Sequence, residues 1–131
     1  MSIIDERFQE LVDLIPKFQK ESKEAITEAS KMISVAFRNE NKVLICGNGG
    51  SAADSQHFAA EFVSAFSRDI TRKGLPALAL TTDSSVMTSI GNDFSFENIF
   101  SRQVQAYSKP GDILVVLTTS GSSTNCINAV L

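Results

Sequence analysis

His57 and Glu61 lie four residues apart, in a stretch whose apolar pattern predicts a helix from Ser51 to about Phe66. Residues four apart share one face of a helix, so the two side chains are expected to be neighbours. An imidazole beside a carboxylate can move protons, and both groups are common metal ligands. A helix histidine that only hydrogen-bonds the acid one turn on would have the same spacing. The pair alone does not distinguish these two readings. A ligand-binding loop close to it would favour a catalytic or metal-binding role.

A loop of that kind directly precedes the predicted helix. The apolar run 43–45 predicts a strand, and it is followed by glycines at 47, 49 and 50 before Ser51. Glycine takes positive φ readily and lets backbone N–H groups approach a ligand. Ser51 can cap the helix, and a helix N-terminus favours a bound anion. The stretch 42–61 thus predicts a phosphate site beside an ionisable pair.

A second polar loop, 118–124, consists of serine and threonine around Gly121 and follows another apolar run, 113–117. Hydroxyl clusters after strands often only cap helices. Two such loops at equivalent strand ends favour an enclosed terminal phosphate instead. The first loop also fits the G-x-G-x-x-A dinucleotide pattern, but weakly, because the acid expected about 20 residues on comes too late, at Asp83.

Three apolar runs alternate with helical patterns and so must position these loops. The runs are 43–45, 76–80 and 113–117; the helical patterns are 51–66, 84–90, a segment from 96 to 106, and 126–131. The triplet 91–93 is expected to break the second of these helices. Continuous apolar strands joined by helices predict an α/β fold, a parallel sheet flanked by helices, with ligands at the carboxyl ends of the strands.

The first 40 residues carry apolar side chains at steps of three and four from Ile4 to Ala36, which predicts a helical segment. Pro16 and the polar stretch 20–23 predict a kink or two helices instead of one straight rod. The apolar stripe could pack on its own domain or form a subunit interface. We therefore divide the chain into an oligomer-forming helical segment, 1–40, and a ligand-binding domain, 41–131.

Charge and cysteine content narrow the class of partner. The 131 residues carry a net charge of −3 without a dense Lys/Arg cluster, which favours small-molecule chemistry over nucleic acid or an anionic membrane. Cys46 and Cys126 lack metal-site spacing, and Cys46 is interpreted as a small core residue at a strand end. The acidic N-terminus is unlike a signal peptide. A cytoplasmic location is expected.

Three stretches, 46–61, 91–94 and 118–123, closely resemble the phosphoheptose isomerases of the sugar isomerase (SIS) domain family, in matching order and over nearly the whole chain. The resemblance implies a five-stranded, flavodoxin-like parallel sheet, of which three strands are found here, and a homotetramer. It also implies conversion of sedoheptulose 7-phosphate to D-glycero-D-manno-heptose 7-phosphate through an enediol, for bacterial lipopolysaccharide or capsule heptose.

Carried over by position, the resemblance assigns Glu61 as the catalytic base. It implies substrate contacts from both loops, from Glu61 and from the 91–94 motif: Asn48, Gly49, Gly50, Ser51, Asn92, Asp93, Thr118, Thr119, Ser120 and Ser123. His57 and Glu61 would be zinc ligands, one ion per subunit, with the remaining ligands outside this chain.

The chain departs from the family pattern at two places. Ala65 stands where the family usually has an arginine, and the family's last two strands and its final Gln/His helix have no counterpart before Leu131. The chain is therefore expected to be C-terminally incomplete and, alone, of doubtful activity. Two other readings are a sugar-phosphate sensor and a non-catalytic binding protein of the replication-initiator-associating type. The latter type departs from the motifs that are intact here at 91–94 and 119–121.

Overall fold

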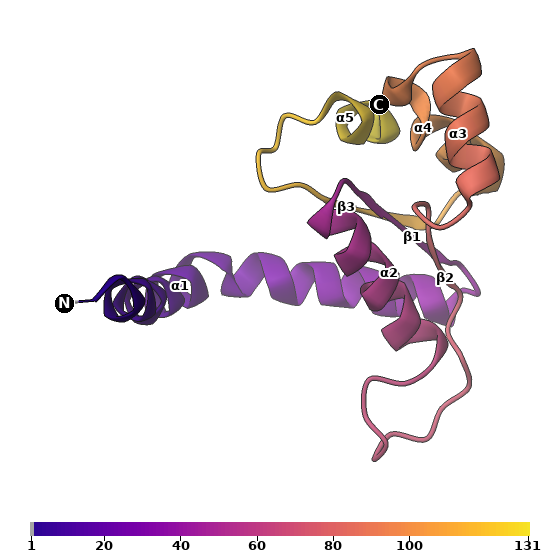
Figure 1. The fold of residues 1–131 in the computed structure, drawn as a ribbon. Helices are drawn as coiled ribbons and strands as arrows, with labels where there is room; N and C mark the ends of the chain where they lie inside the picture. Colours follow the sequence, from indigo (N-terminus) through magenta and orange to yellow (C-terminus); the bar gives the residue numbers. More distant parts are fainter. Residues whose placement is uncertain (1) are drawn as a thin grey trace. The chain divides into compact units, whose positions relative to one another are not determined.

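A computed structural model describes residues 2–131 (Figure 1), which divide at Ser34 into a helical unit and an α/β unit. Helix α1 spans Ile3–Arg38 without interruption. The predicted alternative of two separate helices is wrong, because Pro16 removes only one backbone N–H donor and the helix continues through it. Most apolar side chains of α1 are more than half exposed. None of the helices in the described residues combines the length and apolar character needed to cross a membrane.

The α/β unit is built on a parallel sheet in the order β2-β1-β3. Strand β1 spans Val43–Gly47 and is completely buried, while β2 (Ala77–Ala79) and β3 (Ile113–Leu117) lie at its two sides. Continuous burial is typical of a parallel strand covered on both faces. The predicted α/β class is confirmed, and the strand order is that of the first three strands of a flavodoxin-like sheet.

Helices cover both faces of this sheet (Figure 1). Helix α2, Gly50–Val63, packs along one face. The other face is covered by α3 (Ser84–Asp93), the 3-10 helix η1 (Phe96–Asn98), α4 (Ser101–Tyr107) and α5 (Thr124–Val130). The hydrophobic core lies between this face of the sheet and these helices. It contains eight buried side chains, including both cysteines: Leu44, Cys46, Leu80, Ile90, Ile99, Phe100, Cys126 and Ala129.

Two predicted helix boundaries are corrected by the structure. Residues 91–93 do not break α3 but form its last turn, because a single glycine is tolerated in a helix and the N-terminus is well capped. The cap is Asp83, whose Oδ1 accepts a hydrogen bond from the Val86 amide at 2.9 Å. The helical pattern from 96 to 106 is divided into η1 and α4.

A buried carboxylate joins β1 to β3 at the amino ends of the two strands. The Asp112 side chain is 3% exposed and forms an ion pair with Lys42 Nζ. It also accepts hydrogen bonds from the backbone amides of Lys42 (2.9 Å) and Lys109 (2.8 Å) and from Asn41 Nδ2 (3.1 Å). Burial raises the pKa of Asp112, but these hydrogen bonds, led by those from Lys42, outweigh burial and hold the pKa well below its ordinary value.

Asp112→Asn is expected to lower the free energy of unfolding by about 2–3 kcal/mol at pH 7, because it places an amide against donors that need an acceptor. The folded-state pKa is lowered, so the stabilisation is complete above the unfolded pKa near 3.8 and is lost as the pH falls toward the folded value. Urea unfolding between pH 7 and pH 2.5 should show the variant converging on the parent protein in acid. Asp13→Asn, on the exposed face of α1, is the control; equal losses in both variants would contradict the assignment.

Candidate active site

The glycine loop is a tight turn between β1 and α2. The Ser51 amide donates to the Asn48 carbonyl at 3.0 Å, and Gly49 has φ 59° and ψ −120°, a combination that favours glycine. The predicted cap at Ser51 is wrong: Gly49 is the cap residue, Ser51 lies inside the first turn, and no side chain of residues 2–131 caps α2. The amides of Ser51, Ala52 and Ala53 donate to the carbonyls of Asn48 and Gly49, so within the described residues the Gly50 amide is the N–H of this first turn that is left for an anion.

The hydroxyl loop between β3 and α5 is held by its own side chains. Thr118 Oγ1 lies 3.5 Å from Ser120 Oγ and 3.4 Å from Ser123 Oγ, and it accepts the Gly121 amide at 3.2 Å. Ser120 Oγ in turn accepts the amide of Ser122. Gly121 has φ 67°, so the reversal of the chain depends on glycine there. The loop thus brings the hydroxyls of three of its four predicted contacts, Thr118, Ser120 and Ser123, together, with Thr118 within 3.5 Å of the other two.

The two loops are joined by a pair of amide side chains. Asn48 Nδ2 donates to Asn125 Oδ1 at 2.8 Å, and Asn125 Nδ2 donates back to Asn48 Oδ1 at 2.8 Å. Asn125 is 4% exposed and lies in the first turn of α5. Sequence reasoning missed Asn125, because nothing in the local pattern indicates a partner 77 residues away. The structure therefore brings the glycine and hydroxyl loops together at the carboxyl ends of β1 and β3.

The ionisable pair on α2 has the predicted geometry. His57 Nε2 lies 2.9 Å from Glu61 Oε1, and because a carboxylate can only accept, the imidazole N–H is the donor. The His57 side chain is 76% exposed and that of Glu61 is 32% exposed. The second carboxylate oxygen, Oε2, is buried and has no hydrogen-bond partner among the described residues. An acceptor of this kind is available to a ligand.

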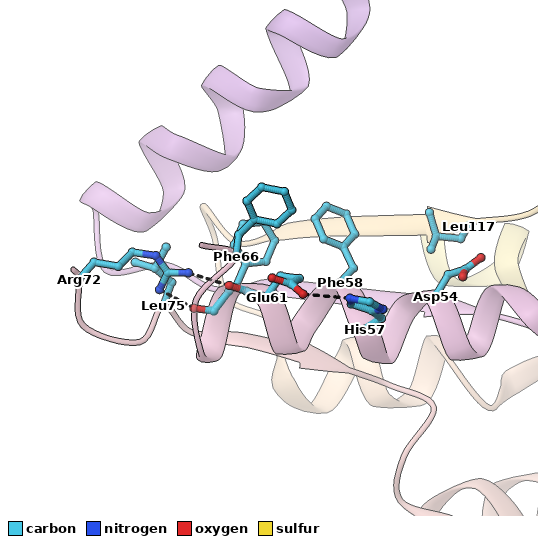
Figure 2. A pocket seen from close by; sticks show the side chains of 9 residues that line it. Asp54, His57, Phe58, Glu61, Phe66, Arg72, Leu75 and Leu117 are labelled. Carbon is cyan, nitrogen blue, oxygen red and sulfur yellow. Dashed lines mark hydrogen bonds and ion pairs between the residues drawn. The ribbon is translucent and has the colours of Figure 1, made fainter. Parts of the chain in front are cut away.

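Glu61 faces a cavity of about 660 Å³ (Figure 2). Aromatic and aliphatic side chains form most of its wall, with four polar ones: Asp54, His57, Phe58, Glu61, Phe62, Phe66, Arg72, Leu75 and Leu117 line it. Asp54 was missed by the sequence analysis, although the spacing 54, 57, 61 places it on the same helix face. Leu117 connects the cavity to the second loop, because it directly precedes Thr118.

Arg72 is a further residue that sequence reasoning missed. Its Nη2 donates to the Glu61 carbonyl at 2.7 Å, and its Nη1 donates to the carbonyls of Phe62 (2.7 Å) and Lys73 (3.0 Å). The guanidinium thus satisfies backbone acceptors near the end of α2, where a positive charge is favourable. Ala65 is exposed and contributes no side chain to the cavity.

Two predicted substrate contacts lie apart from this arrangement. Asn92 and Asp93 are exposed in the last turn of α3, where Asn92 Nδ2 donates to Asp93 Oδ1 at 2.8 Å. Neither residue lines the cavity, and the residues of the two loops do not line it either. Within residues 2–131, no cluster of three or more His, Cys, Asp or Glu side chains is arranged to hold a metal ion.

Comparison with known proteins places this arrangement in a family. The SIS domain model matches residues 7–131. Two curated relatives are the phosphoheptose isomerases of Aliarcobacter butzleri, 46% identical over 98% of this chain, and of Clostridium acetobutylicum, 58% identical over 78%. Among solved structures, the phosphoheptose isomerase of Neisseria gonorrhoeae superposes with a TM-score of 0.88 at 42% identity over 97% of this chain, and that of Francisella tularensis with 0.91 at 37% over 99%.

The matches cover 67% and 51% of the two curated relatives and 65% and 69% of the two solved chains, so this chain spans about half to two thirds of their length. The family match extends across the glycine loop, α2, the sheet and the hydroxyl loop. The chain therefore belongs to the SIS domain family.

Proposed function

We propose that the protein containing this chain converts sedoheptulose 7-phosphate to D-glycero-D-manno-heptose 7-phosphate. The observation that carries the proposal is that one helix, α2, begins at the glycine loop and carries, further along, a carboxylate whose Oε2 has no partner among the described residues. Ser51 and Glu61 are ten residues apart on α2, roughly 15 Å along the helix axis, and the Glu61 side chain tilts back toward the N-terminus. A ligand that reaches both must be extended, with phosphate at one end and the reacting carbons at the other. The matched relatives named phosphoheptose isomerase support this reading.

The chemistry needs a base that can give its proton back, together with the movement of a second proton between the two oxygens. Glu61 would take a proton from C1 of the ketose while O2 gains a proton, which gives the enediol; it would then return its proton to C2 while the O1 hydroxyl loses a proton, which gives the aldose. The buried, unpartnered Oε2 is the atom proposed for this transfer, while the hydrogen bond from His57 to Oε1 fixes the carboxylate.

A zinc ion fits this site only in part. His57 and the Glu61 carboxylate are donor types that zinc prefers, but zinc on His57 Nε2 would replace the hydrogen bond from that nitrogen to Glu61 Oε1. We propose that these two side chains contribute to a zinc site whose remaining ligands come from outside residues 2–131. When bound, zinc would supply polarisation of the substrate carbonyl. Measuring zinc content in the parent protein and in His57→Ala tests this, and equal content in both would contradict it.

The exposed apolar side chains of α1 support self-association of the chain, and the number of copies, four, is proposed from the family resemblance. They are exposed at spacings of three and four: Ile4, Phe8, Leu11, Ile15 and Phe18 are each more than half exposed. Burial of such a stripe against other copies would remove it from water.

Leu11→Glu combined with Ile15→Glu is therefore expected to shift the protein from tetramer to smaller species, because each change places a charge in the apolar interface. Size-exclusion chromatography with light scattering gives the mass directly. Lys17→Glu, also on α1, is the control and should leave the mass unchanged. A tetramer that survives the double substitution would contradict a role for this face.

The remaining assignments follow the proposed substrate. We propose that the product is used to make the heptose of lipopolysaccharide or capsule. The free, buried thiols of Cys46 and Cys126 support a reducing compartment such as the cytoplasm.

The test is an assay of the intact gene product with sedoheptulose 7-phosphate, followed by separation of ketose and aldose phosphates. Formation of the heptose 7-phosphate supports the proposal. A folded protein that binds the sugar phosphate without turnover would contradict it and favour a sensor. Neither binding nor turnover, with capture of a replication initiator, would favour the non-catalytic alternative.

A further inference from the structure

The amide pair between the loops occupies the Asn48 side chain on both of its polar atoms. One N–H of Asn48 Nδ2 donates to Asn125 Oδ1 at 2.8 Å, the second N–H faces Cys126 Sγ at 3.6 Å, and Asn48 Oδ1 accepts from Asn125 Nδ2. A phosphate could take a donor from this side chain only in place of the weak bond to sulfur. A direct contact between the Asn48 side chain and phosphate, the simplest reading of the sequence motif, is therefore disfavoured by the geometry.

The same pair is well placed to set the distance between the two loops. Asn125 is 4% exposed, so an unpaired amide there would be costly, and both of its bonds to Asn48 are at optimal length. Asn48 begins the turn that exposes the N-terminus of α2, and Asn125 lies two residues after Ser123 of the hydroxyl loop. A change in this pair is therefore expected to alter the position of one loop relative to the other.

We propose that Asn48 and Asn125 are positioning residues that clamp the two halves of a phosphate site. In this arrangement, phosphate is held by backbone N–H groups of the glycine loop and by hydroxyls of the second loop, and Asn48 contributes its backbone only. The inference rests on the proposed function for the identity of the sugar phosphate, but binding of inorganic phosphate tests it without turnover.

Asn48→Ala and Asn125→Ala should each weaken binding of inorganic phosphate, measured by calorimetry on the intact protein, by about tenfold, the effect of one lost hydrogen-bonded pair. Because the two side chains act as a unit, the double variant should bind no more weakly than either single variant. KM for sedoheptulose 7-phosphate should rise with little change in kcat, because Glu61 is untouched. Asn128→Ala, one turn further along α5, removes an amide that contacts only the Glu97 carbonyl and should bind phosphate normally.

Normal phosphate binding by a folded Asn125→Ala variant, with loss in Asn48→Ala alone, would overturn the clamp and restore a direct Asn48 contact. Should Asn125→Ala fail to fold, nuclear magnetic resonance of the unaltered protein decides the point. Added phosphate should then change the chemical shifts of the backbone amides of residues 48–51 and leave the chemical shift of the Asn48 side-chain amide unchanged. The opposite pattern would overturn the proposal. Absent turnover with intact phosphate binding would count against the isomerase function only.

Discussion

Glu61→Gln is expected to reduce kcat for sedoheptulose 7-phosphate by about a thousandfold, within the range for loss of a general base. Glutamine is almost the same size and can keep a hydrogen bond to His57 through its carbonyl oxygen, but it cannot accept a proton from carbon. Binding of the sugar phosphate should persist, because both loops of the proposed phosphate site are unchanged. Steady-state kinetics together with calorimetric binding separate the two effects.

The matched control for this substitution is Glu97→Gln, an exposed glutamate on η1 outside the cavity. It should leave both kcat and binding unchanged. Turnover by Glu61→Gln within a factor of ten of the parent enzyme would remove Glu61 from the mechanism. Loss of binding as well as turnover would instead indicate that the carboxylate acts mainly on the ground state.

Gly47→Ala should cause the largest loss of stability, about 3 kcal/mol or more, since small-to-large changes against fixed backbone are poorly relieved. A Cβ at Gly47 would lie 2.7 Å from the Leu117 carbonyl oxygen, 2.8 Å from Ser51 Cβ and 2.9 Å from the Ser51 carbonyl oxygen. These contacts come from β3 and α2, so relief requires moving the sheet or the helix. Urea unfolding monitored by circular dichroism measures the loss.

Gly50→Ala is the matched control, because a Cβ there meets no atom within 4 Å and the residue begins α2. The substitution should leave the free energy of unfolding unchanged or raise it by up to about 1 kcal/mol, because alanine lowers the conformational entropy of the unfolded chain. Similar losses in both variants would show that loop flexibility, and not the close approach of three elements at Gly47, limits stability.

The fold was predictable because its strands are short apolar runs and its loops are rich in glycine and hydroxyl side chains. The helix face of His57 and Glu61 was predictable from spacing alone, and the structure places their side chains 2.9 Å apart. Ser51 was assigned as a cap because serine is favoured there, yet the turn through Gly49 makes glycine the cap residue.

Two of the residues that were missed, Asn125 and Arg72, hydrogen-bond to other segments of the chain, whereas Asp54 lies on the same face of α2 as His57 and could have been found from its spacing. Asn125 pairs with Asn48 across the two loops, and Arg72 reaches back to the end of α2 from an irregular segment. Neither contact has a local periodicity, so no single-sequence pattern could indicate it. The roles of Asn92 and Asp93 stay predictions, because within this chain they contact each other and not the cavity.

Strands β1 and β3 serve different purposes at their two ends. At their amino ends, the buried Asp112 and Lys42 tie them together; at their carboxyl ends, they carry the two loops of the proposed phosphate site. The buried pair at the amino ends serves stability alone, whereas Gly47 at the carboxyl end of β1 serves both the packing of β3 and α2 and the loop that follows it. A redesign could therefore change the amino-end pair without touching the proposed phosphate site, while loops grafted onto the carboxyl ends would have to keep Gly47.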